Sequence, residues 1–197
     1  MLMVIRLANK KDCPQVAKIH RQEIKKGFLS ELGEKFLSKL YGTMIVSVFA
    51  FVIVAKSRDR VIGFISGCTS VSKFYKDFFK KYFFQVSLLL LPKIFRISIL
   101  KKICETLKYP KQKKRKLPEA ELLTIAVSPA FQGKGVAEEL FKDFLNEMKK
   151  RKVKQFKVVV GEELGRAIKF YEKTGFQLHS SISIHKNKQS RVYIFTL

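Results

Sequence analysis

The sequence predicts a mixed α/β (α+β) fold. Short apolar runs typical of strands alternate with amphipathic runs typical of helices, in the order β-α-α-β-β, an insert, then β-α-β-α-β-β. The chain has 197 residues, of which 47% are hydrophobic, which is enough to build one complete core. We therefore expect a single domain over residues 1–197, with helices flanking a central sheet.

The first half of the chain should contain three strands and two helices. Asp12, followed three residues later by Gln15, has the spacing of a capping box and predicts the start of the first helix. The expected elements are a strand over residues 3–8, the helix that begins at Asp12, a helix over about 29–44, and strands over 49–57 and 60–70 joined by a hairpin turn.

The second half repeats the alternation of strands and helices. Gly175 is suited to end a short helix in the left-handed conformation. The expected elements are strands over residues 120–127 and 155–161, a helix that follows Gly135, a helix over 166–175, and strands over 176–185 and 190–197.

An insert over about residues 73–116 interrupts this alternation with aromatic and basic residues. We expect helical pieces that end in a basic loop over residues 108–116. Its aromatic residues can cover one side of a substrate pocket, stack nucleic-acid bases, or contact a membrane surface or a second subunit. The sequence leaves these alternatives open.

The charge of the chain is strongly positive. Lys and Arg number 40 against 16 Asp and Glu, which gives a formal net charge of +24. Such a field favours anionic partners, including nucleotides, nucleic acid and acidic membranes. A lysine-rich proteome is the alternative explanation, because the lysines are spread along the whole chain.

Cysteine usage and hydropathy favour a cytoplasmic protein without a membrane span. The three cysteines, Cys13, Cys68 and Cys104, are far apart and form neither a disulfide framework nor a metal-binding pair. The apolar run over residues 45–55 is too short to span a bilayer, and the run over 83–100 contains Pro92, Lys93 and Arg96. We also expect no signal peptide.

A glycine-rich segment between the strand at 120–127 and the next helix has the composition of an anion site. Gly133 and Gly135 let the backbone approach phosphate oxygens, and the helix that follows directs unpaired N–H groups and a positive dipole toward them. Neither the P-loop pattern nor G-x-G-x-x-G is present. The segment therefore predicts a pyrophosphate site of another kind.

This segment resembles the acetyl-CoA loop of the GNAT N-acetyltransferase superfamily, whose pattern is Q/R-x-x-G-x-G/A. Residues 132–137 read QGKGVA, and residues 167–176 match a second family pattern, A-x-x-x-Y-x-x-x-G-F. The resemblance implies the GNAT acyl-CoA N-acyltransferase fold, with a mixed, mostly antiparallel central sheet flanked by helices and a helical insert between strands three and four. It also implies acetyl-CoA as the co-substrate.

The resemblance implies where acetyl-CoA would bind. In the family the strand before the loop splays from the fifth strand, the pantetheine arm lies in the gap, and here the Val127 N–H would donate to the thioester carbonyl. Leu164 stands where many members carry Asn, so one contact to the arm would differ. The implied contacts are Ile125, Ala126, Val127, Gln132, Gly133, Lys134, Gly135, Val136, Ala137, Ala167, Phe170 and Tyr171.

Tyr171 is the candidate general acid. The matching tyrosine of the family lies beside the CoA sulfur, and the reference pKa of a phenol, about 10, is close to that of an aliphatic thiol. Proton transfer to the leaving thiolate would then be nearly balanced. The alternative is that Tyr171 packs on the sheet with Ala167 and Phe170.

Glu121 is the candidate general base. It and Val127 are evenly spaced on one expected strand, so their side chains should point to the same face of the sheet. Histone-acetyltransferase-type members place a basic glutamate at the matching position, and apolar neighbours would raise the pKa of its carboxyl group. The alternatives are a carboxylate at the solvated end of the strand and an ordered water as the base.

The candidates for acceptor binding are His20, Glu31 and Glu34. His20 lies on the apolar face of the first helix, in a region that shapes the acceptor pocket of the family. The two glutamates flank the joint between the first two helices and are suited to hold a cationic acceptor. A core histidine and two solvated carboxylates are the alternatives. His179 and His185 have no cysteine or carboxylate beside them, so we expect no metal.

These features predict an enzyme that moves an acetyl group from acetyl-CoA to a primary amine in a ternary complex. No cysteine lies in the matched motifs, so we expect direct transfer. An anionic small molecule, such as a nucleotide-linked amino sugar, fits the positive charge as acceptor. The alternatives are a protein N-terminus or lysine, and, in another class, a non-catalytic module that binds nucleic acid or a membrane surface. We expect a monomer or a homodimer.

Overall fold

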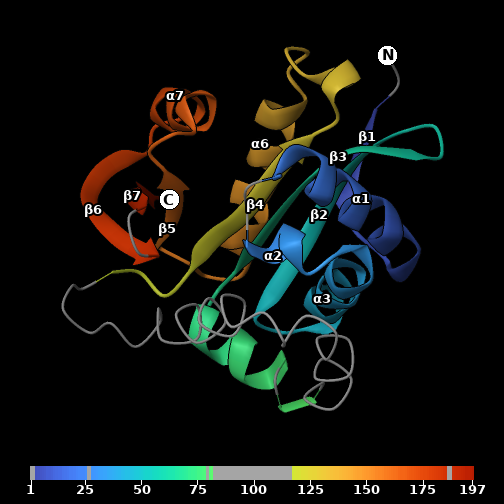
Figure 1. Ribbon diagram of the computed structural model, residues 1–197, viewed down its shortest axis with the longest axis horizontal. Helices are drawn as coiled ribbons and strands as arrows, with labels where there is room; N and C mark the ends of the chain where they lie inside the picture. Colours follow the sequence, from blue (N-terminus) through green and yellow to red (C-terminus); the bar gives the residue numbers. More distant parts are fainter. Residues whose placement is uncertain (1–2, 26–27, 79, 82–116, 186–187) are drawn as a thin grey trace.

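The structure is a computed structural model that describes residues 3–25, 28–78, 80–81, 117–185 and 188–197. A twisted sheet runs through the molecule, with helices packed on both of its faces (Figure 1). This arrangement confirms the α/β class that the sequence predicts. The basic loop expected over residues 108–116 lies outside the described residues, as does most of the insert.

The sheet has seven strands in the order β1-β2-β3-β4-β5-β7-β6. All neighbouring strands are antiparallel except β4 and β5, which are parallel. A mixed, mostly antiparallel sheet is therefore confirmed. The strands are β1 (Val4–Leu7), β2 (Ala50–Ser57), β3 (Arg60–Cys68), β4 (Glu121–Val127), β5 (Gln155–Gly161), β6 (Gln177–His185) and β7 (Lys188–Thr196).

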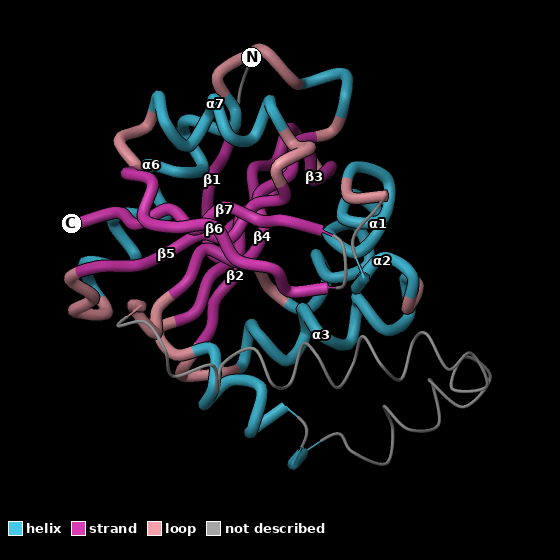
Figure 2. The backbone as a smooth tube through the Cα atoms, turned by 60° about the vertical axis from the view of Figure 1, so that its left-hand side comes forward, coloured by secondary structure: helices cyan, strands magenta, loops and turns pink. Residues whose placement is uncertain are grey.

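The helices divide between the two faces of the sheet, and Figure 2 shows both sets. On one face lie α1 (Cys13–Glu23), α2 (Phe28–Glu31) and α3 (Glu34–Val46). On the other lie α6 (Val136–Lys150) and α7 (Gly165–Lys173). The hydrophobic core is accordingly made of two clusters, which we call the α1–α3 cluster and the α6–α7 cluster after the helices that cover them.

The α6–α7 cluster is rich in phenylalanine. Phe156 of β5 stacks on Phe195 of β7 at 5.3 Å between ring centroids, and Phe141 of α6 lies edge-on to Phe195 at 5.6 Å. Such ring pairs add specific geometry to the burial of apolar area. They join β5, β7 and α6 into one packed body, which fixes the position of α6 relative to β5.

Two expectations for the helices on the first face are wrong. Asp12 and Gln15 do not form a capping box: the Asp12 carboxylate accepts hydrogen bonds from Arg6 and from the Asn9 N–H, and the Gln15 side chain accepts one from the Val61 N–H. Asn9 caps a short 3₁₀ helix (Lys10–Asp12) that precedes α1. The single helix expected over residues 29–44 is divided into α2 and α3 at Gly33, whose φ is 92°.

The described start of the insert is helical over residues 71–78 and 80–81. Phe74 and Phe78 are buried in the α1–α3 cluster, and Phe78 packs edge-on against Phe36 of α3 at 6.2 Å. This part of the insert therefore belongs to the core. The later aromatic residues of the insert lie outside the described residues.

Candidate functional site

The parallel strands β4 and β5 pair over a short distance only. Their register contains Glu121 opposite Lys157 and Leu122 opposite Val158. On its other edge, β4 stays paired with β3 as far as Val127, which lies opposite Gly63. Beyond Leu122, the edge of β4 that faces β5 therefore has no strand partner among the described residues, and the two strands diverge into a gap.

An irregularity in β4 decides which backbone groups face this gap. The register with β3 passes from Ser66–Thr124 to Gly67–Leu122, so β4 holds one extra residue there, as in a β-bulge. At the far end of β4, the Ser128 N–H donates to the Ile62 carbonyl of β3 at 2.8 Å. Because N–H directions alternate along a strand, those of Val127 and Ile125 point toward the gap.

The same irregularity overturns one expectation. Glu121 and Val127 do not share a face of the sheet: Val127 belongs to the α6–α7 cluster, whereas Glu121 lies opposite Cys68, which belongs to the α1–α3 cluster. The extra residue reverses the alternation between the two positions, so even spacing in the sequence no longer means the same face.

The chain leaves β4 through a turn that has the form of an anion cradle. Gly133 and Gly135 have φ values of 71° and 77°, and a Cβ built on either would meet no atom within 4 Å. The glycines are needed for their left-handed backbone, and the space above them is open. The first helical hydrogen bond of α6 joins the Glu139 N–H to the Gly135 carbonyl, so the preceding N–H groups lack a helical acceptor.

The polar side chains of the turn hold its shape. The Lys134 ammonium donates to the Ala130 carbonyl at 2.9 Å and lies 5.6 Å from the centre of the Phe131 ring. The Gln132 amide nitrogen donates to the Val127 carbonyl at 2.9 Å and to the Glu23 carboxylate at 2.9 Å. Sequence reasoning missed Glu23, because no local pattern reports a contact between residues so far apart in the chain.

Tyr171 lies on α7 and is buried in the α6–α7 cluster together with Val127 and Val136. Phe170 and Phe176 lie edge-on to its ring at 5.7 and 5.2 Å. Its hydroxyl has no hydrogen-bond partner among the described residues, and burial raises the pKa of the phenol. The group therefore stays protonated over the physiological pH range and is available as a proton donor.

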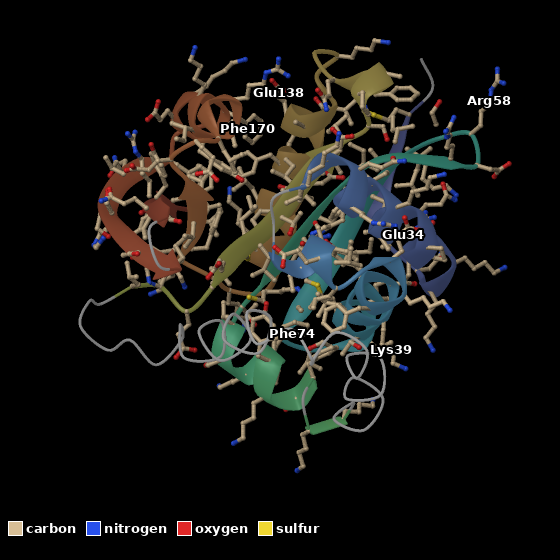
Figure 3. The ribbon with its side chains drawn as sticks, viewed as in Figure 1. Glu34, Lys39, Arg58, Phe74, Glu138 and Phe170 are labelled. Atoms are coloured by element: carbon tan, nitrogen blue, oxygen red, sulfur yellow. The ribbon has the colours of Figure 1, made fainter. Side chains whose placement is uncertain are left out.

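The helices α6 and α7 contact each other through side chains, including the rings of Phe141 and Phe170 at 6.0 Å. Figure 3 labels Glu138 in the first turn of α6 and Phe170 on α7. An ion pair of 3.6 Å links Glu138 to Lys173. Phe170 and Ala167 are half-buried against the same cluster as Tyr171, while Leu164, at the N-cap of α7, is 46% exposed.

Glu121 is buried and paired with a buried lysine. Its carboxylate lies 3.2 Å from the Lys157 ammonium, which also donates to the Pro118 carbonyl. Burial raises the pKa of Glu121, and the charge and hydrogen bond of Lys157 act in the opposite direction. Glu121 is thus not a solvated carboxylate at the end of the strand.

The predicted acceptor residues occupy two different environments. His20 is 2% exposed, and its Nδ1 lies 2.6 Å from the Tyr41 hydroxyl. Burial lowers the pKa of His20 to about 4, so the ring is neutral near pH 7. Glu31 and Glu34 are exposed, and Glu34 pairs with Arg21 at 3.1 Å on the surface.

The described residues offer neither a metal-binding group nor a membrane-spanning helix. They contain no group of three or more His, Cys, Asp or Glu side chains arranged to hold a metal ion. No helix within the described ranges is long and apolar enough to cross a membrane.

A parallel strand pair that splays apart and leads into a glycine cradle is the arrangement that the resemblance to GNAT N-acetyltransferases implies. Residues 21–176 match the sequence profile of the Acetyltransferase (GNAT) family, and the chain belongs to this family. The family and the acetyltransferases among its relatives support an acetyl-CoA-dependent N-acyltransferase, as the sequence predicts. The open cradle at Gly133 and Gly135 fits the pyrophosphate of that co-substrate.

One relative is similar to part of this chain. The [ribosomal protein bS18]-alanine N-acetyltransferase of Haemophilus ducreyi is 34% identical over 85 residues, which are 43% of this chain and 50% of that protein. The match thus spans only half the length of this curated relative.

Solved structures share the fold over the whole chain. The PaiA N-acetyltransferase of Thermoplasma acidophilum, solved in complex with coenzyme A, is 14% identical with a TM-score of 0.64 and full coverage of both chains. The ribosomal-protein-S18-alanine N-acetyltransferase of Escherichia coli is 14% identical with a TM-score of 0.62, over 99% of this chain and 94% of that one. Ard1 of Thermoplasma volcanium is 18% identical with a TM-score of 0.63, over 100% and 99%.

Proposed function

We propose that this enzyme transfers the acetyl group of acetyl-CoA to the α-amino group of a polypeptide. The observation that carries the catalytic part is the gap between β4 and β5, which opens after Leu122 and leads to the glycine turn. The acceptor class is supported by the relative of 34% identity, which is named for the alanine of a ribosomal protein.

In this proposal the backbone holds the co-substrate. The N–H groups of residues 133–137 receive the pyrophosphate, and the edge of β4 from Ile125 to Val127 pairs with the pantetheine arm. Acetyl-CoA supplies an acetyl group that is activated as a thioester. The Val127 N–H, which points into the gap, donates to the thioester carbonyl and stabilises the negative charge that grows on its oxygen during attack.

Tyr171 returns a proton to the leaving sulfur. Its phenol is buried among aromatic rings in the same cluster as Val127. Because burial raises its pKa, the phenol is protonated when the thiolate forms beside it, but the proton transfer is less balanced than the reference pKa of about 10 would make it. Phe170 and Ala167 support α7 on one side and line the path of the co-substrate on the other.

Glu121 takes up the proton that the acceptor amine loses, through a chain of water molecules, because roughly 20 Å of strand separates it from Val127. Its side chain lies on the α1–α3 face, and burial raises its pKa toward the range in which a carboxylate is an effective base. Lys157 opposes this effect. The acceptor would then approach from the face that also carries His20, Glu31 and Glu34.

A second acceptor class has its own support. The formal net charge of +24 favours an amine carried by an anionic small molecule, such as a nucleotide-linked amino sugar. This acceptor would use the same gap and the same Tyr171. The positive field would assist its encounter with the enzyme and would lose this effect at high salt.

The test is an acetyl-CoA-dependent thiol-release assay over a panel of amines. The panel holds hexapeptides that begin with alanine, serine or methionine, the same peptides with a blocked α-amine, a lysine-containing blocked peptide and nucleotide-linked amino sugars. We expect thiol release with a free-α-amine peptide and none with its blocked form, and mass spectrometry should locate the acetyl group on the first residue. Turnover of the amino sugars alone would replace the peptide with the second acceptor, and no turnover at all would refute the proposal.

A further inference from the structure

One side-chain amide connects the helix α1 to the reaction centre. The Gln132 amide nitrogen carries two hydrogens, and it donates one to the Val127 carbonyl and the other to the Glu23 carboxylate, each at 2.9 Å. Because the Val127 N–H and carbonyl point to the same side of β4, this carbonyl also faces the gap. The amide of Gln132 therefore sits at the mouth of the gap.

This link places a carboxylate beside the backbone group that would receive the thioester. Both acceptor oxygens lie 2.9 Å from the same nitrogen, so the Glu23 Oε2 and the Val127 oxygen are within about 6 Å of each other. Glu23 is the last residue of α1 and is half-buried. In Figure 1 the end of α1 crosses in front of β4.

We propose that Glu23 is the acceptor-binding residue, and that its carboxylate holds the ammonium form of the amine at the mouth of the gap. The inference rests on the proposed function, because it takes Val127 as the group that receives the thioester carbonyl. It adds the residue that brings the second reactant to that point.

The charge on Glu23 is available for this role. Among the described residues, no basic side chain pairs with Glu23: Arg21 pairs with Glu34, and Lys134 donates to the Ala130 carbonyl. The Gln132 amide donates to the Oε2 atom of Glu23. A carboxylate has about four acceptor positions on its two oxygens, so others stay available. An incoming ammonium can therefore bind without breaking the link to Gln132.

A cationic amine can bind to a protein whose net charge is +24 because most of the positive side chains lie far from Glu23. At physiological ionic strength, exposed charges beyond about 8 Å are largely screened. A bound ammonium would be in hydrogen-bond contact with Glu23, where screening is weak, so this one carboxylate outweighs the distant lysines. It also selects an amine over a neutral group of the same shape.

The experiment compares Glu23→Gln with a matched control, Asp59→Asn, which removes an exposed carboxylate in the turn between β2 and β3, using the free-α-amine hexapeptide that the panel identifies. The Gln side chain at 23 keeps an oxygen that accepts from Gln132, so the turn keeps its support while the charge is lost. We expect the KM of the peptide to rise about tenfold in Glu23→Gln, with kcat and the Kd of coenzyme A within twofold of wild type. Asp59→Asn should leave all three unchanged.

A purely structural role for Glu23 would give a different pattern. It would raise the Kd of coenzyme A as well, and it would not change the salt dependence. If Glu23 binds the ammonium, the peptide KM of the wild type rises between 50 and 500 mM NaCl, and that of Glu23→Gln rises much less. Turnover by both proteins with the same KM would refute the inference and leave the proposed function standing, whereas no turnover of any amine would refute both.

Discussion

The Glu121 carboxylate lies 3.2 Å from the Lys157 ammonium at the point where β4 and β5 begin to diverge. Both side chains are buried, and Lys157 also binds the Pro118 carbonyl. The pair thus joins the two strands across the closed end of the gap. A buried charge pair of this kind costs desolvation energy and adds little net stability. Its role is to fix the position at which β4 and β5 separate.

Lys157→Met should therefore destabilise the enzyme more at high pH than at low pH. The variant leaves a buried carboxylate without its cation, a change that typically costs about 3–5 kcal/mol. Burial already raises the pKa of Glu121 above that of the unfolded chain, and removing Lys157 raises it further. The protonated carboxyl avoids the cost, so the loss appears as pH rises through the folded pKa.

Urea unfolding of wild type and Lys157→Met at pH 5 and pH 8 measures this effect. We expect the deficit of the variant to be larger at pH 8. The double variant Glu121→Gln, Lys157→Met should recover most of it, because the uncompensated charge is gone. Equal deficits at both pH values, or no recovery in the double variant, would show that the pair is not buried as described.

Gly135→Ala should weaken coenzyme A binding while the protein stays folded. The φ of 77° at Gly135 costs an L-residue about 1–2 kcal/mol, and the added methyl group meets no protein atom within 4 Å. That methyl group projects into the open space in which the proposal places the pyrophosphate. We expect the Kd of coenzyme A to rise about tenfold or more, measured by calorimetry.

The control for this test is Gly165→Ala. A Cβ at Gly165 also meets no atom within 4 Å, and its φ is not in the left-handed range. The Kd of the Gly165→Ala variant for coenzyme A should match that of the wild type. A Gly135→Ala variant that binds coenzyme A normally would place the pyrophosphate somewhere other than the glycine turn.

Tyr171→Phe should lower kcat by about 10²-fold without weakening coenzyme A binding. The phenol has no hydrogen-bond partner among the described residues, so removing its oxygen leaves no buried group unsatisfied. The melting temperature should stay equal or rise slightly. A variant with wild-type kcat across the accessible pH range would mean that another group, or water, protonates the thiolate.

Local patterns predicted most elements of the fold, and the glycine turn with them. The strand over residues 155–161 and the end of the short helix at Gly175, with its φ of 98°, follow from residues that are neighbours in sequence. The glycine that divides the second helix, Gly33, is a local signal, but the four-residue spacing of Leu32, Phe36 and Leu40 favours a continuous helix. The turn could be predicted because Gly133 and Gly135 are needed for their own left-handed backbone angles, which do not depend on distant residues.

What the sequence could not predict depends on partners far along the chain. Asp12 does not cap the helix as expected, because its carboxylate accepts a hydrogen bond from Arg6 on β1. The extra residue in β4 exists only relative to its pairing with β3, so the expected face of Glu121 was wrong. Glu23 is hydrogen-bonded to Gln132, which lies 109 residues further along the chain, and no periodicity in the sequence predicts that contact.

His20→Gln should reduce the loss of stability on acidification. Burial between Tyr41 and Phe64 lowers the pKa of His20 to about 4, whereas the unfolded ring titrates near 6.5. The unfolded chain therefore binds this proton first as pH falls, and the folded state loses about 3 kcal/mol between pH 6.5 and 4. Gln does not titrate and keeps a polar group for the Tyr41 hydroxyl. Unfolding free energies of the two proteins at pH 7 and pH 4 should thus differ in their pH dependence by about this amount. Parallel pH profiles would mean that the His20 ring takes up a proton in the folded state as readily as in the unfolded chain. That result would favour the predicted place of His20 in the acceptor pocket over a place in the core.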